Sequence, residues 1–317
     1  MHVIQLQRIT INHAGRDIFS DLTWAVDNRA KVGFVGPNGA GKSSLLKAIA
    51  GEITPSKGQI TTMGGVSVGY LPQDVRLPAG TLYEAACQPS PDLLAVTAAL
   101  EAVEAHMGDP AVYNDGDALN DAIERQASIL AVYERLDPAR QASLVRELLA
   151  KLGFTRDDFD LPTSALSGGQ TKLAALARLA AWSPDVLLLD EPDNHLDLAS
   201  KSALETFLRV YRGGVILVSH DRYLLDAVVT EIAELDTGTL SNYIGNYSAY
   251  TVERELRRIR QQQMHVAQQK VIQRIEAAIK EWSEKAKNDA NERHARQAAS
   301  RRTVSYTHLT LPTNREV

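Results

Sequence analysis

The sequence predicts an α/β fold that is interrupted by a helical subdomain and followed by a long helix. Short apolar runs alternate with helical patterns across residues 1–88 and 164–246, which is typical of a mainly parallel sheet covered by helices. Alanine, leucine and acidic residues dominate residues 89–163. Residues 247–302 contain neither proline nor glycine. We therefore expect an α/β core in two segments, an inserted helical subdomain and a helical linker.

Composition places the chain among globular proteins. Of its 317 residues, 44% are hydrophobic and 23% are charged, which argues against a disordered chain. No apolar run approaches the ~18 residues that indicate a membrane helix, and the start of the chain lacks the pattern of a secretory signal. The lone Cys87 has no partner for an internal disulfide and is interpreted as a small buried hydrophobic residue. These features predict a cytoplasmic location.

Charge is unevenly distributed along the chain. The net charge is −5, but residues 254–302 hold 13 Lys and Arg against 6 Asp and Glu, a surplus of +7, and residues 1–253 carry −12. A basic helix attached to an acidic body suggests that the helix meets a polyanion. The alternative is a solvated helix whose charges keep it soluble.

The first core segment is expected to contain five strands and one helix. The strands are expected at 3–11, 18–26, 31–35, 58–62 and 66–71, and the helix at 43–50.

Helices are expected next at 92–107, 118–136 and 139–152 in the subdomain. The second core segment is expected to contain helices at 169–182 and 198–210, strands at 186–190 and 214–218, and two edge strands within 230–243.

A phosphate-binding loop is predicted at GPNGAGKS, residues 36–43. The string fits G-x-x-x-x-G-K-[ST] and lies between an expected strand and an expected helix, the context that surrounds phosphates with backbone N–H groups and a helix N-terminus. Lys42 is expected to hold the β- and γ-phosphates, and Ser43 to ligate Mg²⁺. The residues expected to bind ATP here are Gly36, Pro37, Asn38, Gly39, Ala40, Gly41, Lys42, Ser43 and Ser44.

Adjacent carboxylates end the apolar strand at 186–190, the arrangement known as Walker B. Asp190 is expected to anchor Mg²⁺, and Glu191 to polarise the attacking water as general base. Two further polar residues follow strands. Gln73, in YLPQD, resembles the Q-loop residue that senses Mg²⁺ and the γ-phosphate, and His220, in VSHDRYLLD, resembles the switch histidine that contacts the γ-phosphate. The predicted catalytic residues are therefore Glu191, His220 and Gln73, and the predicted Mg²⁺ ligands are Ser43, Gln73 and Asp190.

These strings, together with LSGGQ at residues 166–170, resemble the ATP-binding cassette (ABC) family. The resemblance implies a P-loop NTPase cassette with an α/β core, an antiparallel β part and an inserted helical subdomain, with ATP and Mg²⁺ as cofactors. In such proteins ATP is bound between the P-loop of one cassette and the LSGGQ of another. The signature residues implied to bind that second nucleotide are Ser167, Gly168, Gly169 and Gln170.

Only one set of these motifs is present, so the resemblance implies a second cassette, either on the same chain or in a homodimer. For the adenine ring the candidates are His13 and Phe19, which follow the first strand or lie near it.

Further strings resemble the F family of soluble cassette proteins that act on ribosomes. DEPDNHLDL at 190–198 resembles the family's DEPTNHLDL, with Asp193 in the usual threonine position. GNYSAYTVERELRR at 245–258 and ERHARQAASRR at 292–302 resemble the two ends of its interdomain linker. The resemblance covers residues 1–302.

The F-family resemblance implies a twin-cassette translation factor. Its partner would be the ribosome, with ribosomal RNA and the peptidyl-site transfer RNA contacted through the 247–302 linker, as the +7 surplus on 254–302 would favour. Residues 89–163 are expected to be too short for the helical hairpin of the family's longer-armed members.

Residues 303–317 fit nothing that precedes them. VSYTHLTLPT, at 304–313, resembles the translation of a transposon-end sequencing adapter, whose next fixed segment would give Val317 and a stop. We expect this tail to be non-native and the natural gene to continue past about residue 302.

Two other function classes share the same catalytic motifs. One is the ATPase subunit of a membrane transporter, and the other is a DNA-repair cassette ATPase. The linker and DEPDNHLDL favour the ribosomal class over the first. The absence of a long coiled coil inside the core argues against the second.

Overall fold

A computed structural model describes residues 2–13, 16–289, 297 and 299–300. Side chains at 13, 16 and 284–289 lie outside this description. The chain divides into two compact units, Met1–Tyr250 and Thr251–Val317, of which the first contains the P-loop, the signature segment and the Walker B strand, and the second contains most of the linker. The predicted tail at 303–317 lies outside the described residues.

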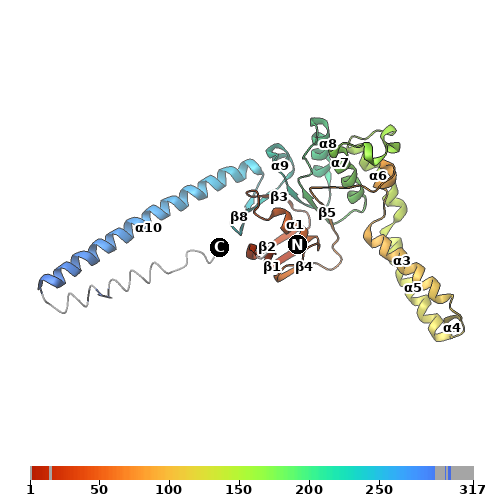
Figure 1. Ribbon diagram of the computed structural model, residues 1–317, viewed down its shortest axis with the longest axis horizontal. Helices are drawn as coiled ribbons and strands as arrows, with labels where there is room; N and C mark the ends of the chain where they lie inside the picture. Colours follow the sequence, from red (N-terminus) through yellow and green to blue (C-terminus); the bar gives the residue numbers. More distant parts are fainter. Residues whose placement is uncertain (1, 14–15, 290–296, 298, 301–317) are drawn as a thin grey trace. The chain divides into compact units, whose positions relative to one another are not determined.

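The P-loop segment lies at the centre of a six-stranded sheet (Figure 1). The strand order is β5 (Val68–Leu71), β6 (Val186–Asp190), β7 (Gly214–Val218), β3 (Lys31–Val35), β8 (Glu231–Asp236) and β9 (Thr239–Ile244). All neighbours are parallel except β8 and β9. The carboxyl ends of β3, β6 and β7 therefore meet at one edge, where ligands bind in open parallel sheets.

A second, three-stranded antiparallel sheet has the order β2 (Arg16–Asp27), β1 (His2–His13) and β4 (Lys57–Thr62). It shares a core with α1 (Lys42–Ile49), the helix that follows the P-loop.

Burial on both faces of the central strands creates two hydrophobic cores. Every residue of β6 and β7 is buried, and their side chains alternate between the cores because successive strand residues point to opposite faces. Val186 and Leu188 pack in the core shared with the three-stranded sheet. Leu187 and Leu189 pack in the core beneath the helices.

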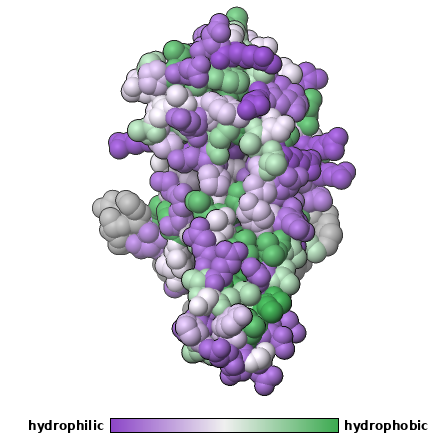
Figure 2. Space-filling model, turned by 90° about the vertical axis from the view of Figure 1, so that its right-hand side faces the viewer, coloured by the Kyte–Doolittle hydropathy of each residue, from purple (hydrophilic) through white to green (hydrophobic). Residues whose placement is uncertain are grey.

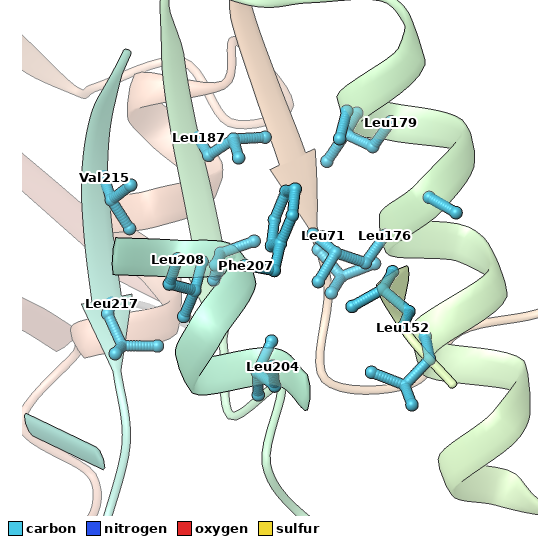
Figure 3. Close-up of a cluster of buried hydrophobic side chains, with 14 of the residues drawn as sticks. Leu71, Leu152, Leu176, Leu179, Leu187, Leu204, Phe207, Leu208, Val215 and Leu217 are labelled. Carbon is cyan, nitrogen blue, oxygen red and sulfur yellow. The ribbon is translucent and has the colours of Figure 1, made fainter. Parts of the chain in front are cut away.

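The helix-side core is covered by α7 (Gly168–Ala181) and α8 (Leu198–Val210). Figure 3 shows Leu187 and Val215 of the strands facing Phe207 and Leu208 of α8, with Leu176 of α7 beyond them. The main contact of α6 (Pro138–Lys151) is with α7, which joins the subdomain to the core.

The inserted subdomain contains a helical hairpin. Its helices α3 (Pro91–Met107) and α5 (Gly116–Leu136) lie side by side in Figure 1, joined by the short α4 (Pro110–Tyr113). The segment therefore forms a helical hairpin, and the expectation that this hairpin is shorter than that of longer-armed cassette proteins stays a prediction. Asp109 and Asp115 cap α4 and α5 through their side chains, so the chain reverses within a few residues.

Apolar side chains remain exposed on the hairpin. The side of the molecule shown in Figure 2 is mostly hydrophilic, with hydrophobic residues between. Leu94 of α3 is 56% exposed and Ile123 of α5 is 45% exposed.

Three short elements complete the subdomain. They are α2 (Leu82–Ala86), capped by Thr81, and two 3₁₀ helices at Asp157–Asp160 and Thr163–Ala165.

The start of the linker is hydrogen-bonded to the cassette within the first unit. Helix α10 (Tyr247–Asp289) begins directly after β9. The buried carboxylate of Glu234, on β8, accepts hydrogen bonds from Tyr250 (2.8 Å) and Tyr243 (3.1 Å). Ser248 donates to Asp226 of α9 (Arg222–Val228) through both its backbone N–H (2.7 Å) and its hydroxyl. The first turn of α10 is therefore held to both β8 and α9.

Among the residues that the structure describes, no helix is both long enough and apolar enough to cross a membrane. The predicted strands and longer helices are confirmed to within about three residues at each described end. Sequence reasoning missed the three short helices α2, α4 and α9, because fewer than two turns leave little periodic signal.

Replacing Tyr250 with Phe is expected to lower the unfolding free energy by roughly 1.5–3 kcal/mol, because the variant loses a hydrogen bond to a buried charged group. Urea denaturation of the chain measures the change. Tyr223→Phe is the matched control, since Tyr223 is 88% exposed and should shift stability by less than about 0.5 kcal/mol. Equal midpoints for Tyr250→Phe and the control would contradict this account.

Candidate active site

The P-loop joins β3 to α1 through three glycines with positive φ. Their φ values are 156° at Gly36, 79° at Gly39 and 99° at Gly41, and the last two lie in a region that disfavours other residues. A Cβ on Gly36 would lie 2.3 Å from the Leu235 carbonyl oxygen, and one on Gly41 would lie 2.4 Å from Ile18. The loop therefore requires glycine both for its backbone angles and for close packing.

Lys42 lies across the start of the loop. Its Nζ donates to the carbonyl oxygens of Gly36 (2.8 Å) and Pro37 (3.0 Å). Burial lowers the pKa of Lys42, while the carboxylates of Glu191 and Asp190 oppose that shift. The ammonium is thus placed inside the loop and close to two acidic groups.

Asp190 has the properties expected of a magnesium anchor. Its side chain is buried, and neither carboxylate oxygen has a hydrogen-bond partner of good geometry. Burial raises the pKa of Asp190, whereas the nearby Ser43 hydroxyl and the cations of Lys47 and Lys42 lower it. Two unpartnered buried oxygens next to a serine hydroxyl fit a hard cation that prefers oxygen ligands. The described residues contain no cluster of three His, Cys, Asp or Glu side chains that could hold a metal.

Gln73 and His220, two of the predicted catalytic residues, lie next to the carboxylate of the third, Glu191. One oxygen accepts from Gln73 Nε2 at 2.9 Å and from Asn194 Nδ2, and the other lies 3.4 Å from His220 Nε2. Glu191 itself has a φ of 50°, which is uncommon outside glycine and often marks functional positions. The carboxylate is therefore fixed from several sides at the end of β6.

Two residues of this arrangement were missed by sequence reasoning. Asn194 binds the Glu191 carboxylate, and Lys172, on α7, donates from Nζ to the Glu191 backbone oxygen at 2.8 Å. Burial lowers the pKa of Lys172. Asn194 lies in the quoted string DEPDNHLDL, so its position three residues after Glu191 was an available signal. Lys172 had none.

The signature segment forms the N-terminus of α7. Ser167 Oγ accepts from the Gln170 backbone N–H (3.2 Å), and Gln170 Oε1 accepts from the Ser167 N–H (2.9 Å). The first turn of a helix has backbone N–H groups without intrahelical partners, so this N-terminus, at which Ser167 and Gly168 are exposed and Gly169 is buried, has the form of an anion site. Among the described residues, no hydrogen bond connects the segment 166–170 with the P-loop of the same chain.

Gly169 lies against the loop that follows β6. A Cβ at this position would come within 2.7 Å of the His195 carbonyl oxygen and 3.0 Å of the Leu196 side chain. Gly168, its neighbour, has open space where a Cβ would lie. The two signature glycines therefore face different constraints.

Asp193 is buried without full hydrogen bonding. It is 4% exposed, and its Oδ1 has no hydrogen-bond partner. Burial raises the pKa of Asp193, although a hydrogen bond from Ser219 opposes the shift. A carboxylate at this position is a local source of instability.

The adenine contact was predicted wrongly for one candidate. Phe19 is 2% exposed and its ring lies 3.1 Å from the position that a Cβ on Gly41 would take. The ring therefore packs beneath the P-loop and has no face free for a nucleotide base. The side chain of His13, the other candidate, lies outside the described residues.

Comparison with protein families gives two matches, both to models described as ABC transporter. One covers residues 19–194 and the other residues 233–304. The first spans the P-loop, the signature segment and the Walker B strand, and the second spans β9 and α10.

Three curated relatives match most of this chain over less than half of their own length. An uncharacterised ABC transporter ATP-binding protein, YfmR of Bacillus subtilis, is 35% identical over 86% of this chain and 42% of its own. The energy-dependent translational throttle protein EttA of Haemophilus influenzae is 37% identical over 81% and 45%. The tylosin resistance ATP-binding protein TlrC of Streptomyces fradiae is 34% identical over 83% and 47%. The chain thus spans about half the length of these relatives.

A solved structure described as the ATP-binding subunit of an ABC transporter has the same fold. It aligns with a TM-score of 0.56 at 18% identity, covering 76% of this chain and 90% of its own. This likeness confirms the predicted α/β cassette fold.

Replacing Gly169 with Ala is expected to lower the unfolding free energy by roughly 1–3 kcal/mol, the usual cost of overpacking. Gly168→Ala is the matched control and should be neutral or stabilising by up to about 1 kcal/mol, because alanine favours helix and has space there. Thermal or urea denaturation distinguishes the two. If both variants behaved alike, the close contact with His195 would not constrain this helix.

Replacing Asp193 with Thr is expected to stabilise the chain in a pH-dependent way. Because the folded pKa of Asp193 is raised above its ordinary value of 3.8, the wild type loses stability as pH rises through the folded pKa. The gain from Thr should therefore be small near pH 4 and reach roughly 1–3 kcal/mol above the folded pKa. Urea midpoints from pH 4 to 8 measure it. A gain that shrinks as pH rises would exclude an uncompensated carboxylate.

Proposed function

The chain belongs to the ABC transporter family, and on that premise we propose that it is an ATPase of the F family that acts on the ribosome. The observation that carries the enzymatic part is the Glu191 carboxylate, fixed by Gln73, Asn194 and His220 at the same sheet edge as the P-loop. The proposed action on the ribosome rests on the linker at 247–302 and on the string DEPDNHLDL at 190–198, which begins at the end of β6.

ATP would lie along the P-loop, with backbone N–H groups and Lys42 around its phosphates. Ser43 and Asp190 would hold Mg²⁺, which supplies positive charge that the transferring phosphoryl group requires. Glu191 would accept a proton from the attacking water, and His220 would contact the γ-phosphate. Gln73 would link the metal to Glu191, to which it already donates a hydrogen bond.

Closure of this site would require a second cassette, on the same chain or in another copy. The N-terminus of α7, formed by Ser167, Gly168, Gly169 and Gln170, would face the γ-phosphate held by the partner cassette. Alone, the chain is expected to bind ATP weakly and hydrolyse it slowly.

Sequence features within this chain support the ribosome as partner. DEPDNHLDL at 190–198 and the linker strings at 245–258 and 292–302 resemble those of the F family. The +7 surplus on 254–302 suits contact with ribosomal RNA and transfer RNA. The names of two relatives, a translational throttle and a tylosin resistance protein, agree with a role in translation or in antibiotic protection.

The second candidate function is that of an ATP-binding subunit in a membrane transporter. It is favoured by the solved structure described in those words. That likeness concerns the cassette fold, which both classes share.

Replacing Glu191 with Gln is expected to lower ATP turnover by about 10²- to 10⁴-fold, because the general base is lost while the shape is kept. A phosphate-release assay on the full-length protein measures it. Glu147→Gln, an exposed position on α6, is the matched control and should retain turnover. Unchanged turnover in Glu191→Gln would remove Glu191 from the chemistry.

The same Glu191→Gln variant decides between the two partner classes. It should trap the ATP-bound closed state, so the full-length protein should co-sediment with ribosomes in ATP at several times the wild-type amount. Failure to enrich with ribosomes while ATP remains bound would reject the ribosomal proposal and leave the transporter class.

A further inference from the structure

A groove of about 530 Å³ lies at the sheet edge opposite the nucleotide site. Its lining includes Asp185 and Gly213, which directly precede the amino ends of β6 and β7. The P-loop and Walker B residues follow the carboxyl ends of strands, so the groove is separate from the chemistry proposed above. Its walls come from α6, from the end of α8 and from the turn between β2 and β3.

One side of the groove is a stripe along α6. Arg140, Leu144, Leu148 and Lys151 line it, and their spacings of four, four and three residues place them on one helix face. Val145 and Leu149 of the same helix are fully buried in the core, and Leu144 and Leu148 pack against that core while remaining partly exposed. The partly exposed sides of Leu144 and Leu148 therefore lie between the cations of Arg140 and Lys151 along the groove.

The opposite side repeats this combination of apolar and cationic groups. Phe207 and Tyr211 pack with ring centroids 5.7 Å apart, and Val210 is 64% exposed beside them. Arg212 and Arg29 complete the lining. An apolar floor is therefore bordered by cations on both sides.

The cations of the groove are largely unneutralised. Arg29, Arg140 and Arg212 form no ion pair with a carboxylate within the described part of the chain, whereas Lys151 pairs with Glu147. The one carboxylate in the lining, Asp185, accepts hydrogen bonds from Ser67 instead. This local positive charge lies on a body, residues 1–253, whose net charge is −12.

We propose that this groove binds an acidic peptide segment of another protein, with a large apolar side chain on the floor and carboxylates on the flanking arginines. Arginine pairs strongly with carboxylates, and aliphatic and aromatic floors accept apolar anchor side chains. A nucleic acid suits the surface less well. Its phosphates gain nothing from a leucine floor, and its length would extend beyond the groove over the acidic body within a Debye length of about 8 Å.

The probe that tests this surface is a phage-displayed library of random dodecapeptides, selected on the full chain and depleted on the Arg140→Glu/Arg212→Glu variant. The enriched peptides should carry Asp or Glu on both sides of Leu, Phe, Trp or Ile. Synthetic, fluorescein-labelled copies should bind the wild type in a fluorescence-polarisation assay.

Two variants then locate the binding. Val210→Glu, at an exposed position, should weaken peptide binding at least tenfold. Arg209→Glu is the matched control: it is the adjacent residue of α8, its side chain is 63% exposed and it does not line the groove, so binding should change less than twofold.

Several results would overturn the proposal. They are enrichment of neutral or basic peptides, equal binding to Val210→Glu and to the wild type, and no enrichment above the depleted variant. Preferential binding of a single-stranded oligouridylate, lost in Arg140→Glu/Arg212→Glu, would replace the peptide with RNA. None of these outcomes depends on whether the chain acts on the ribosome.

Discussion

Burial of the central parallel strands on both faces is the constraint on which the other features depend. Strands β6 and β7 have no solvent-facing side, so their residues alternate between two hydrophobic cores. This fixes their register, because a slip by one residue would exchange the side chains of the two cores. The register also fixes where these strands end, and so which polar residues just beyond them lie together at the carboxyl edge of the sheet.

The fold and the main site residues were accessible from the sequence because both depend on local pattern. The P-loop, the carboxylates after β6 and the histidine after β7 each follow a short apolar run, and parallel pairing brings such ends to one edge. The predicted roles of these residues are proposals still, but the structure does place Gln73, Glu191 and His220 together.

What the sequence did not reveal depends on contacts between distant segments. Lys172 reaches a backbone oxygen nineteen residues away, and no spacing rule predicts that pairing. The sequence places Phe19 near the first strand but does not show that its ring is buried. The ring packs against Gly41 because β2 lies beneath the P-loop. Helices α3 and α5 were predicted from their periodicity, but their packing side by side depends on the two capped turns that join them.

The contact of Gly169 with His195 has a consequence for the proposed two-cassette assembly. The signature helix of a cassette would serve the nucleotide of its partner, while the loop after β6 serves its own. Since no side chain fits between them, and Lys172 joins the same helix to Glu191, the two cannot shift independently. In such an assembly, a movement of the loop after β6 on hydrolysis would be passed to the signature helix, and through that helix to the nucleotide of the partner cassette.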